Sequence, residues 1–366
     1  MSALDELLQS YRTAAVTERE KGTYFERLAC TYLTADPVQS EEYSQVWTWA
    51  DWAADQGRNG KDVGIDLVAK LRNEDGYAAI QCKFYGPTHR IQKADIDSFI
   101  SASGKDPFVR RVVIDTTEVS WGTNAEEMIV GQSIPVVRLS LTHLRESQID
   151  WSIYGIRGEA VLTAKKTLRP HQMEALEAVR SGLDVADRGK LIMACGTGKT
   201  FTSLKIAEDL VGAGGRGLFM VPSLALMSQT VREWTNDTDT ALRSFAVCSD
   251  AQVGKRRVSN DDAAEIDAHD LAFPATTNPA RLIEKAGDDD PDRMTVVFST
   301  YQSIAVLDAA QKAGLPAFDL IVCDEAHRTT GATLANEEDS NFVRIHDDAY
   351  VEGHKRLYMK IGRAHV

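Results

Sequence analysis

The sequence predicts an α/β protein of two domains, in which a smaller mixed α/β domain precedes a doubly wound parallel sheet. Its 366 residues exceed the usual size of one domain, which is about 100–150 residues. Up to residue 150, helical patterns are mixed with a β-hairpin and further strands. After residue 168, strands and helices alternate, and strands connected through helices pair in parallel.

The first domain is predicted to begin with a helical segment over residues 1–35, because its apolar residues recur at spacings of three and four. Two strands, 65–69 and 77–82, flank the sequence Asn-Glu-Asp-Gly, which is typical of a hairpin turn. The other elements expected in this domain are a short strand, a helix and two further strands, at residues 46–49, 91–103, 109–115 and 134–139.

The second domain is predicted to open with an amphipathic helix from residue 168, where Pro170 suits the first turn. Residues 250–293 are rich in Asp, and we interpret them as a solvated insertion in preference to a regulatory segment. The alternating strands and helices are expected at 191–194, 202–211, 217–221, 224–234, 295–299, 320–323 and 356–359.

Composition and charge exclude several classes of protein. The longest apolar runs fall well short of the roughly 20 residues that a transmembrane helix needs, and no secretory signal opens the chain. A net charge of −13 argues against a small protein that coats nucleic acid. A cytoplasmic enzyme without disulfides or structural zinc is expected, because the five cysteines are scattered and none forms a C-x-x-C pair.

The segment Ala-Cys-Gly-Thr-Gly-Lys-Thr lies between an apolar strand and a helix. The backbone amides of Gly196, Thr197 and Gly198 can surround a phosphate, because small residues let the chain approach it closely. Lys199 can reach the β- and γ-phosphates, and the Thr200 hydroxyl can ligate Mg²⁺. The second domain is therefore predicted to bind ATP and Mg²⁺.

Two acidic residues, Asp324 and Glu325, follow the apolar strand 320–323 and precede Ala326 and His327. In a parallel sheet this strand ends at the edge where the phosphate loop lies. Asp324 would hold Mg²⁺, mostly through water, and Glu325 would act as general base on the attacking water.

The phosphate loop and the acidic pair resemble those of the DEAH-type helicases and translocases of superfamily 2. Met193 stands where the commonest phosphate loop has Gly, a departure that is usual in this superfamily. The resemblance implies the first lobe of a RecA-like fold. It also implies that Gln172, in Leu-Arg-Pro-His-Gln, hydrogen-bonds adenine. Residues 221–224 and 298–303 would then contact the DNA backbone through hydroxyls and amides.

Four residues of the first domain could form a metal-dependent site. Gln81 and Lys83 are two apart on one strand, so their side chains share a face, and Asp66 on the neighbouring strand could meet them. One carboxylate and a backbone carbonyl can hold a divalent ion, while Lys83 positions or deprotonates the attacking water. Glu26, on the preceding helix, could add a carboxylate. The structural alternative is a hairpin lysine that extends its amine to water.

This constellation resembles the Mrr-like branch of the PD-(D/E)xK nucleases, in which Gln often replaces the middle acid. The resemblance implies a restriction-endonuclease-like domain that cuts double-stranded DNA with Mg²⁺. Asp66 would be its metal ligand, and Gln81, Lys83 and Glu26 would be the other catalytic residues. Local positive charge agrees with a DNA substrate and comes from Lys61, Lys83, His89, Arg90 and Lys93.

A nuclease of this kind in front of a superfamily 2 motor resembles the type ISP restriction–modification enzymes, which are single-chain relatives of the type I systems. The resemblance implies ATP-dependent translocation on DNA coupled to cleavage, in restriction of foreign DNA. It further implies that the full-length protein continues into a second RecA-like lobe, a methyltransferase and a target-recognition domain. We expect a nuclease domain at 1–155, a linker at 156–167 and the incomplete first lobe at 168–359.

The last residues, 360–366, resemble the in-frame translation of a sequencing-library adapter. We therefore expect a non-native tail that packs against nothing, with a natural basic tail as the alternative. Two other functions stay open. One is a DNA-remodelling helicase whose first domain is a catalytically inactive, DNA-binding module. The other is a fragment that binds ATP or DNA without turnover.

Overall fold

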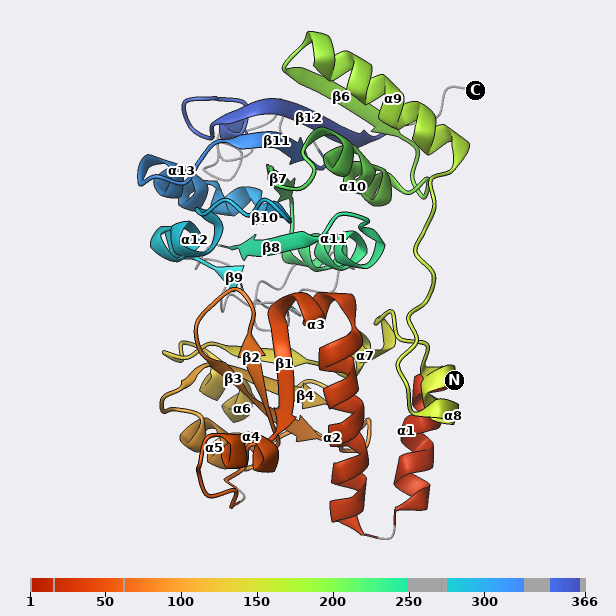
Figure 1. Cartoon of the computed structure of the whole chain (residues 1–366), viewed down its shortest axis with the longest axis vertical. Helices are drawn as coiled ribbons and strands as arrows, with labels where there is room; N and C mark the ends of the chain where they lie inside the picture. The colour runs from red at the N-terminus through yellow and green to blue at the C-terminus, as the bar shows by residue number, and fades with distance from the viewer. Residues whose placement is uncertain are drawn as a thin grey trace. The chain divides into compact units, whose positions relative to one another are not determined.

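The computed structural model divides the chain into two compact units (Figure 1). Unit 1 holds residues 1–164 and 269–274, and unit 2 holds 165–268 and 275–366. Each unit has its own sheet and its own hydrophobic core. The structure describes residues 2–15, 17–61, 63–248, 271, 275–325 and 343–362.

Unit 1 is built on a five-stranded sheet of order β1-β2-β3-β4-β5. The first three strands pair antiparallel and the last three pair parallel. The β2–β3 hairpin is confirmed, and its turn contains Gly76 at φ 118°, a conformation that glycine adopts without steric cost. The strands are β1 Tyr43–Thr48, β2 Leu67–Leu71, β3 Tyr77–Lys83, β4 Phe108–Asp115 and β5 Val136–Leu139.

Helices cover both faces of this sheet. Helices α1, α2, α7 and α8 bury residues such as Leu8 against one face, and α4, α5 and α6 bury residues such as Phe99 against the other. The helical segment 1–35 is two helices, because the Thr17 hydroxyl caps the second by accepting from the Glu20 amide. The helices are α1 Ala3–Ala14, α2 Glu18–Ala35, α3 Pro37–Glu42, α4 Trp49–Asp55, α5 Lys93–Ala102, α6 Thr123–Ile129, α7 Leu141–Arg145 and α8 Trp151–Arg157.

Unit 2 contains a seven-stranded sheet of order β6-β12-β11-β7-β10-β8-β9, in which every pair is parallel. This confirms the predicted doubly wound architecture. Its central strands are buried along their whole length, as parallel strands covered on both faces should be. The strands are β6 Arg188–Met193, β7 Arg216–Val221, β8 Leu242–Val247, β9 Ala275–Thr276, β10 Met294–Thr300, β11 Phe318–Cys323 and β12 Gly353–Ile361.

The two faces of the second sheet are packed by different helices. Helices α12 and α13 bury Leu282 and Leu307 on one face. On the other face, Trp234 of α11 packs edge-on against Phe219 and Phe298 of the sheet. The helices are α9 Pro170–Val185, α10 Lys199–Leu210, α11 Leu224–Asp237, α12 Pro279–Ala286, α13 Ile304–Lys312 and the 3₁₀ turn η3 Tyr301–Ser303.

Part of the acidic region 250–293 belongs to the core of unit 2, which corrects the interpretation of a solvated insertion. Helix α12 lies within this region and is capped by the Asn278 side chain. Its Leu282 and Ala286 are buried, because residues four apart lie on the same face of a helix. Residues 249–270 lie outside the described part of the chain.

The expected linker 156–167 is shorter than the sequence suggested. It starts within α8, and Leu162 forms an antiparallel bridge with Ile149. The first half of this segment is therefore folded onto unit 1.

We expected residues 360–366 to pack against nothing, and this is wrong for the first two of them. Lys360 and Ile361 belong to β12 and pair with Ile192 and Met193 of β6. Residues 363–366 lie outside the described part of the chain.

Within the described ranges, no helix is long and apolar enough to cross a membrane. All five cysteines, which lie in the described part of the chain, are free thiols.

Candidate functional site

The phosphate loop lies at the carboxyl end of β6, and α10 begins at its Lys199. Gly196 and Gly198 have φ of 74° and 82°, in the left-handed region that side chains disfavour. Thr197 closes the turn by donating from its hydroxyl to Ala194 O at 2.7 Å. The space in front of Gly196 is open, since a Cβ there would have no neighbour within 4 Å. The loop thus has the tight backbone and open front that a phosphate requires.

Lys199 contacts both acidic residues that were predicted at this edge of the sheet. Its Nζ lies 2.5 Å from Asp324 Oδ1 and 2.5 Å from Glu325 Oε1. Burial lowers the pKa of Lys199, but the two carboxylates outweigh that effect and leave the pKa above its ordinary value. Burial raises the pKa of Asp324, and Lys199 only partly opposes it. The lysine is therefore a fixed cation beside the loop.

Backbone contacts hold the acidic pair in place after β11. The Asp324 amide donates to Met220 O of β7 at 2.9 Å. The Tyr301 hydroxyl, fully buried after β10, donates to Asp324 O at 2.8 Å. Glu325 has φ 52°, and among the described residues it is the one non-glycine position with positive φ. Such strain is typical of residues held in place for a function. His327 lies outside the described residues.

Gln172 contacts the phosphate loop directly. It is 4% exposed, and its Nε2 donates to Thr197 O at 3.0 Å and to Gly198 O at 3.4 Å. A Cβ at Gly198 would overlap this nitrogen, so glycine is required there by packing as well as by φ. The neighbouring His171 also bonds Thr197 O, at 3.1 Å, a contact that the sequence did not indicate.

The predicted DNA-tracking motifs follow β7 and β10, but their hydroxyls have local partners. Ser223 caps α11 by accepting from the Leu226 amide. Thr300 and Ser303 bond each other at 2.7 Å. In this conformation, these side chains therefore stabilise their own loops.

The residues predicted for a metal-dependent site gather at the end of the β2–β3 hairpin. Asp66 directly precedes β2. Because Leu67 pairs with Ile80 in this antiparallel ladder, Asp66 lies opposite Gln81. Its Oδ2 accepts from the Cys82 amide at 2.6 Å. Gln81 donates through Nε2 to Gly64 O at 3.2 Å, while its buried Oε1 lacks a hydrogen-bond partner among the described residues. A buried oxygen of this kind is costly unless a donor or a cation satisfies it.

Glu26 on α2 and Lys83 on β3 both influence the pKa of the neighbouring Cys82 thiol. Burial raises the pKa of the Cys82 thiol well above its usual value, the charges of Asp66 and Glu26 raise it further, and Lys83 opposes them. The charges of all three groups therefore act on one residue, Cys82, which the motif did not single out.

The chemistry of this donor set limits how a metal could be held. In the described part of the chain, no group of three His, Cys, Asp or Glu side chains could hold a metal ion. A divalent ion would therefore need amide or backbone oxygens beside Asp66 and Glu26. The buried Oε1 of Gln81 fits that requirement. Asp62, at the start of the motif, lies outside the described residues.

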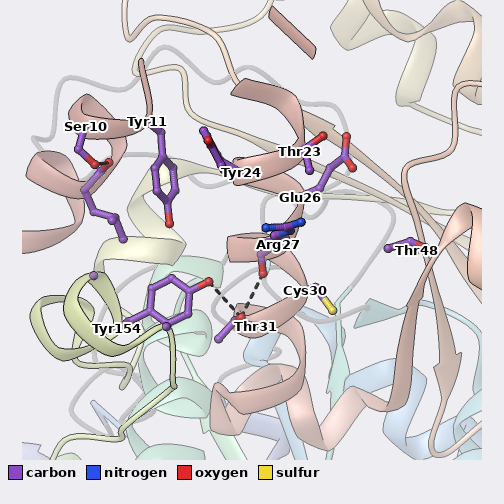
Figure 2. Close-up of a pocket in the computed structure, with 13 residues that line it drawn as sticks. Ser10, Tyr11, Thr23, Tyr24, Glu26, Arg27, Cys30, Thr31, Thr48 and Tyr154 are labelled. Carbon is purple, nitrogen blue, oxygen red and sulfur yellow. Dashed lines mark hydrogen bonds between the residues drawn. The ribbon is translucent and has the colours of Figure 1, made fainter. Parts of the chain in front are cut away.

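A cleft of about 720 Å³ opens beside Glu26 in unit 1 (Figure 2). Helices α1, α2 and α8 form its walls together with the end of β1. The side chains that Figure 2 labels in it are Ser10, Tyr11, Thr23, Tyr24, Glu26, Arg27, Cys30, Thr31, Thr48 and Tyr154.

Comparison with known families matches both units. Residues 34–160 match the family model described as a restriction endonuclease. Residues 165–355, more than half of the chain, match the model described as the res subunit of type III restriction enzymes. No curated protein matches the chain.

Solved structures extend the match to nearly the whole chain. The structure described as the ATP-dependent Type ISP restriction-modification enzyme LlaBIII bound to DNA is 36% identical, with a TM-score of 0.82. It covers 98% of this chain, which spans only 22% of LlaBIII. A nuclease-deletion mutant of the Type ISP enzyme LlaGI, in complex with a DNA substrate mimic, is 41% identical over 53% of this chain and 17% of its own, with a TM-score of 0.42. The chain therefore belongs to the res-subunit family of restriction enzymes, with a restriction endonuclease domain in front of the helicase domain as in the Type ISP restriction–modification enzymes.

Proposed function

We propose that this chain belongs to a larger enzyme that restricts foreign DNA, in which unit 2 contributes to ATP-dependent movement along double-stranded DNA and unit 1 cuts the DNA with Mg²⁺. The observation that carries the proposal is the contact of Lys199 with Asp324 and Glu325 beside the phosphate loop. The proposal that the chain cuts DNA is supported by the position of Asp66 opposite Gln81 in the endonuclease domain.

In unit 2, the amides of the phosphate loop and Lys199 would bind the β- and γ-phosphates of ATP. Lys199 would then exchange its carboxylate partners for phosphate oxygens. Thr200 and Asp324 offer the oxygen ligands that Mg²⁺ prefers, and the ion would neutralise charge on the transferred phosphate. Glu325, released from Lys199, would accept a proton from the attacking water. Gln172 would hold the loop in shape and bind adenine.

In unit 1, Asp66 would hold Mg²⁺ with Gln81 Oε1, and Glu26 would add a carboxylate. The ion would stabilise charge on the scissile phosphate. Lys83 would orient the attacking water, because an ammonium group donates hydrogen bonds and carries a positive charge.

The test is Mg²⁺-dependent cleavage of plasmid DNA by the full chain and by Asp66→Ala. We expect the substitution to reduce the cleavage rate by at least about a hundredfold, because the ion loses its ligand. The domain should stay folded, although the Cys82 amide loses its acceptor. The matched control is Asp75→Ala, which removes an exposed carboxylate from the turn of the same hairpin. Equal cleavage by the wild-type chain and Asp66→Ala would refute the nuclease assignment.

A second candidate is a DNA-binding module without nuclease activity. It is favoured by one feature, the neutral Gln81 at the position where an acid would add charge to the metal site. A wild-type chain that binds plasmid DNA but does not cut it with Mg²⁺ would support this function.

A further inference from the structure

The cleft between α1, α2 and α8 adjoins the candidate nuclease site. Thr48 lies in the wall of the cleft and pairs with Leu67, the residue after Asp66. The amide of Trp49, the residue after Thr48, donates to Asp66 O at 2.9 Å. Glu26 lines the cleft and also acts on the Cys82 thiol beside Asp66. A molecule bound in this cleft would therefore lie close to the backbone of Asp66 and to Cys82.

The cleft offers few hydrogen-bond donors. The hydroxyls of Ser10, Thr23 and Thr31 already donate to helix carbonyls at 2.7–3.1 Å. The Thr48 hydroxyl donates to Asp51 Oδ2 at 2.6 Å. These four hydroxyls therefore have no spare hydrogen to donate to a bound molecule.

Arg27 is the exception among these groups. Its side chain is exposed and lines the cleft (Figure 2). Among the described residues, no ion pair or hydrogen bond of its guanidinium is found. Some buried or half-buried arginines of unit 1 have carboxylate partners, as Arg110 has with Glu42 and Arg145 has with Asp5, whereas Arg27 presents its guanidinium to the cleft. An exposed guanidinium in a cleft suits a phosphate, which it can bind with two parallel hydrogen bonds.

Aromatic rings lie beside this arginine. The rings of Tyr11 and Tyr24 are 5.4 Å apart at an angle of 33°, and both line the cleft. Burial and the neighbouring Tyr154 hydroxyl raise the pKa of Tyr11 to about 12, so its ring stays neutral beside a phosphate. Rings next to one cation are the arrangement that binds a nucleic-acid strand without reading its sequence.

We propose that this cleft holds one strand of the DNA substrate beside the scissile phosphate. Arg27 pairs with a backbone phosphate, and the ring of Tyr24 packs against a sugar or base. The proposal rests on the proposed nuclease function and names residues that position its substrate. Glu26 repels the same phosphate, so strand binding in the cleft should strengthen when a divalent cation neutralises the carboxylates.

The experiment is photo-crosslinking of the full chain to a duplex that carries 5-bromodeoxyuridine, in Ca²⁺, followed by peptide mapping. Mapping distinguishes the cleft from DNA contacts made elsewhere in the chain. We expect a crosslinked peptide that contains Tyr24 or Tyr11. Its yield at limiting DNA should fall about tenfold in Arg27→Ala, because one charge-assisted contact is lost. Arg27→Lys should retain most of the yield.

The matched control is Arg19→Ala, which removes an exposed arginine from the same helix outside the cleft and should leave the crosslink unchanged. Crosslinks that avoid both tyrosines, or that survive Arg27→Ala at full yield, would overturn the proposal. Asp66→Ala separates the two hypotheses, since it should stop cleavage and keep the crosslink. If Asp66→Ala still cuts plasmid, the nuclease assignment fails. The crosslink to Tyr24 or Tyr11 would still test whether the cleft binds a DNA strand.

Discussion

Cys82 shows at the scale of one residue how the charges of the hairpin site act together. Its amide holds the Asp66 carboxylate, and its thiol lies in the field of Asp66, Glu26 and Lys83. Because burial and the two carboxylates together outweigh the lysine, the pKa of the thiol is raised and it holds its proton more tightly than an isolated cysteine does. The reactivity of this thiol therefore reports on the charge of the site without any need for DNA cleavage.

We expect alkylation of Cys82 by iodoacetamide at pH 8.5 to be faster in Asp66→Asn than in the wild-type chain. Asparagine keeps the acceptor for the Cys82 amide but removes a negative charge, so the pKa falls and more thiolate is present. Adding Ca²⁺ to the wild-type chain should act in the same direction. Mass spectrometry of the labelled peptides measures both rates, with the exposed Cys195 as internal reference. Unchanged Cys82 labelling in a folded Asp66→Asn chain would contradict this cluster.

Helix α12 is the element that sequence patterns described least well. Its carboxyl end is held by arginines from two strands, because Arg216 donates to Ala286 O and Arg243 donates to Lys285 O. These bonds satisfy carbonyls that a helix end leaves unpaired. They also explain why β8, interrupted by Arg243 and Ser244, did not show an apolar pattern.

We expect Leu282→Ala to lower the free energy of unfolding by about 2–5 kcal/mol, since Leu282 is fully packed in the core of unit 2. Urea unfolding followed by circular dichroism measures this loss. Glu284→Ala, an exposed position on the same helix, should stay within about 0.5 kcal/mol of wild type. A Leu282→Ala chain as stable as the control would mean that the acidic region is an insertion after all.

The predictable parts of this protein are those set by local chemistry. The hairpin turn, the glycines of the phosphate loop and the apolar strands before Lys199 and Asp324 each have a short-range cause, and the structure has them where expected. The contact of Gln172 with the loop, the orphaned oxygen of Gln81 and the core role of α12 depend on residues far apart in sequence. No spacing rule could show them.

At the scale of the whole molecule, the chain spans 22% of LlaBIII, so its activity in isolation is a separate question. The described nucleotide site is built on a single parallel sheet. Superfamily 2 ATPases, which this unit resembles, bind nucleotide between two lobes, and the second lobe supplies an arginine to the γ-phosphate.

We expect the 366-residue chain to bind ATP·Mg²⁺ weakly and to hydrolyse it barely above background, with or without DNA. An arginine of that kind is worth on the order of 10³–10⁵ in rate. Calorimetry should show binding lost in Lys199→Ala and kept in Lys190→Ala, an exposed lysine on β6. Robust DNA-stimulated hydrolysis that disappears in Glu325→Gln would mean that the chain completes its site by another route, such as dimerisation.

The bond from Tyr301 to Asp324 O links the segment after β10 to the acidic pair after β11. Both partners are buried, so separating them costs about 1–3 kcal/mol with no water to compensate. Such an energy corresponds to a roughly 5–150-fold bias between two states. If a bound DNA strand displaced the segment after β10, the acidic pair after β11 would therefore change the conformations that it populates. By the same linkage, a change at the acidic pair would alter how strongly the segment after β10 binds the strand.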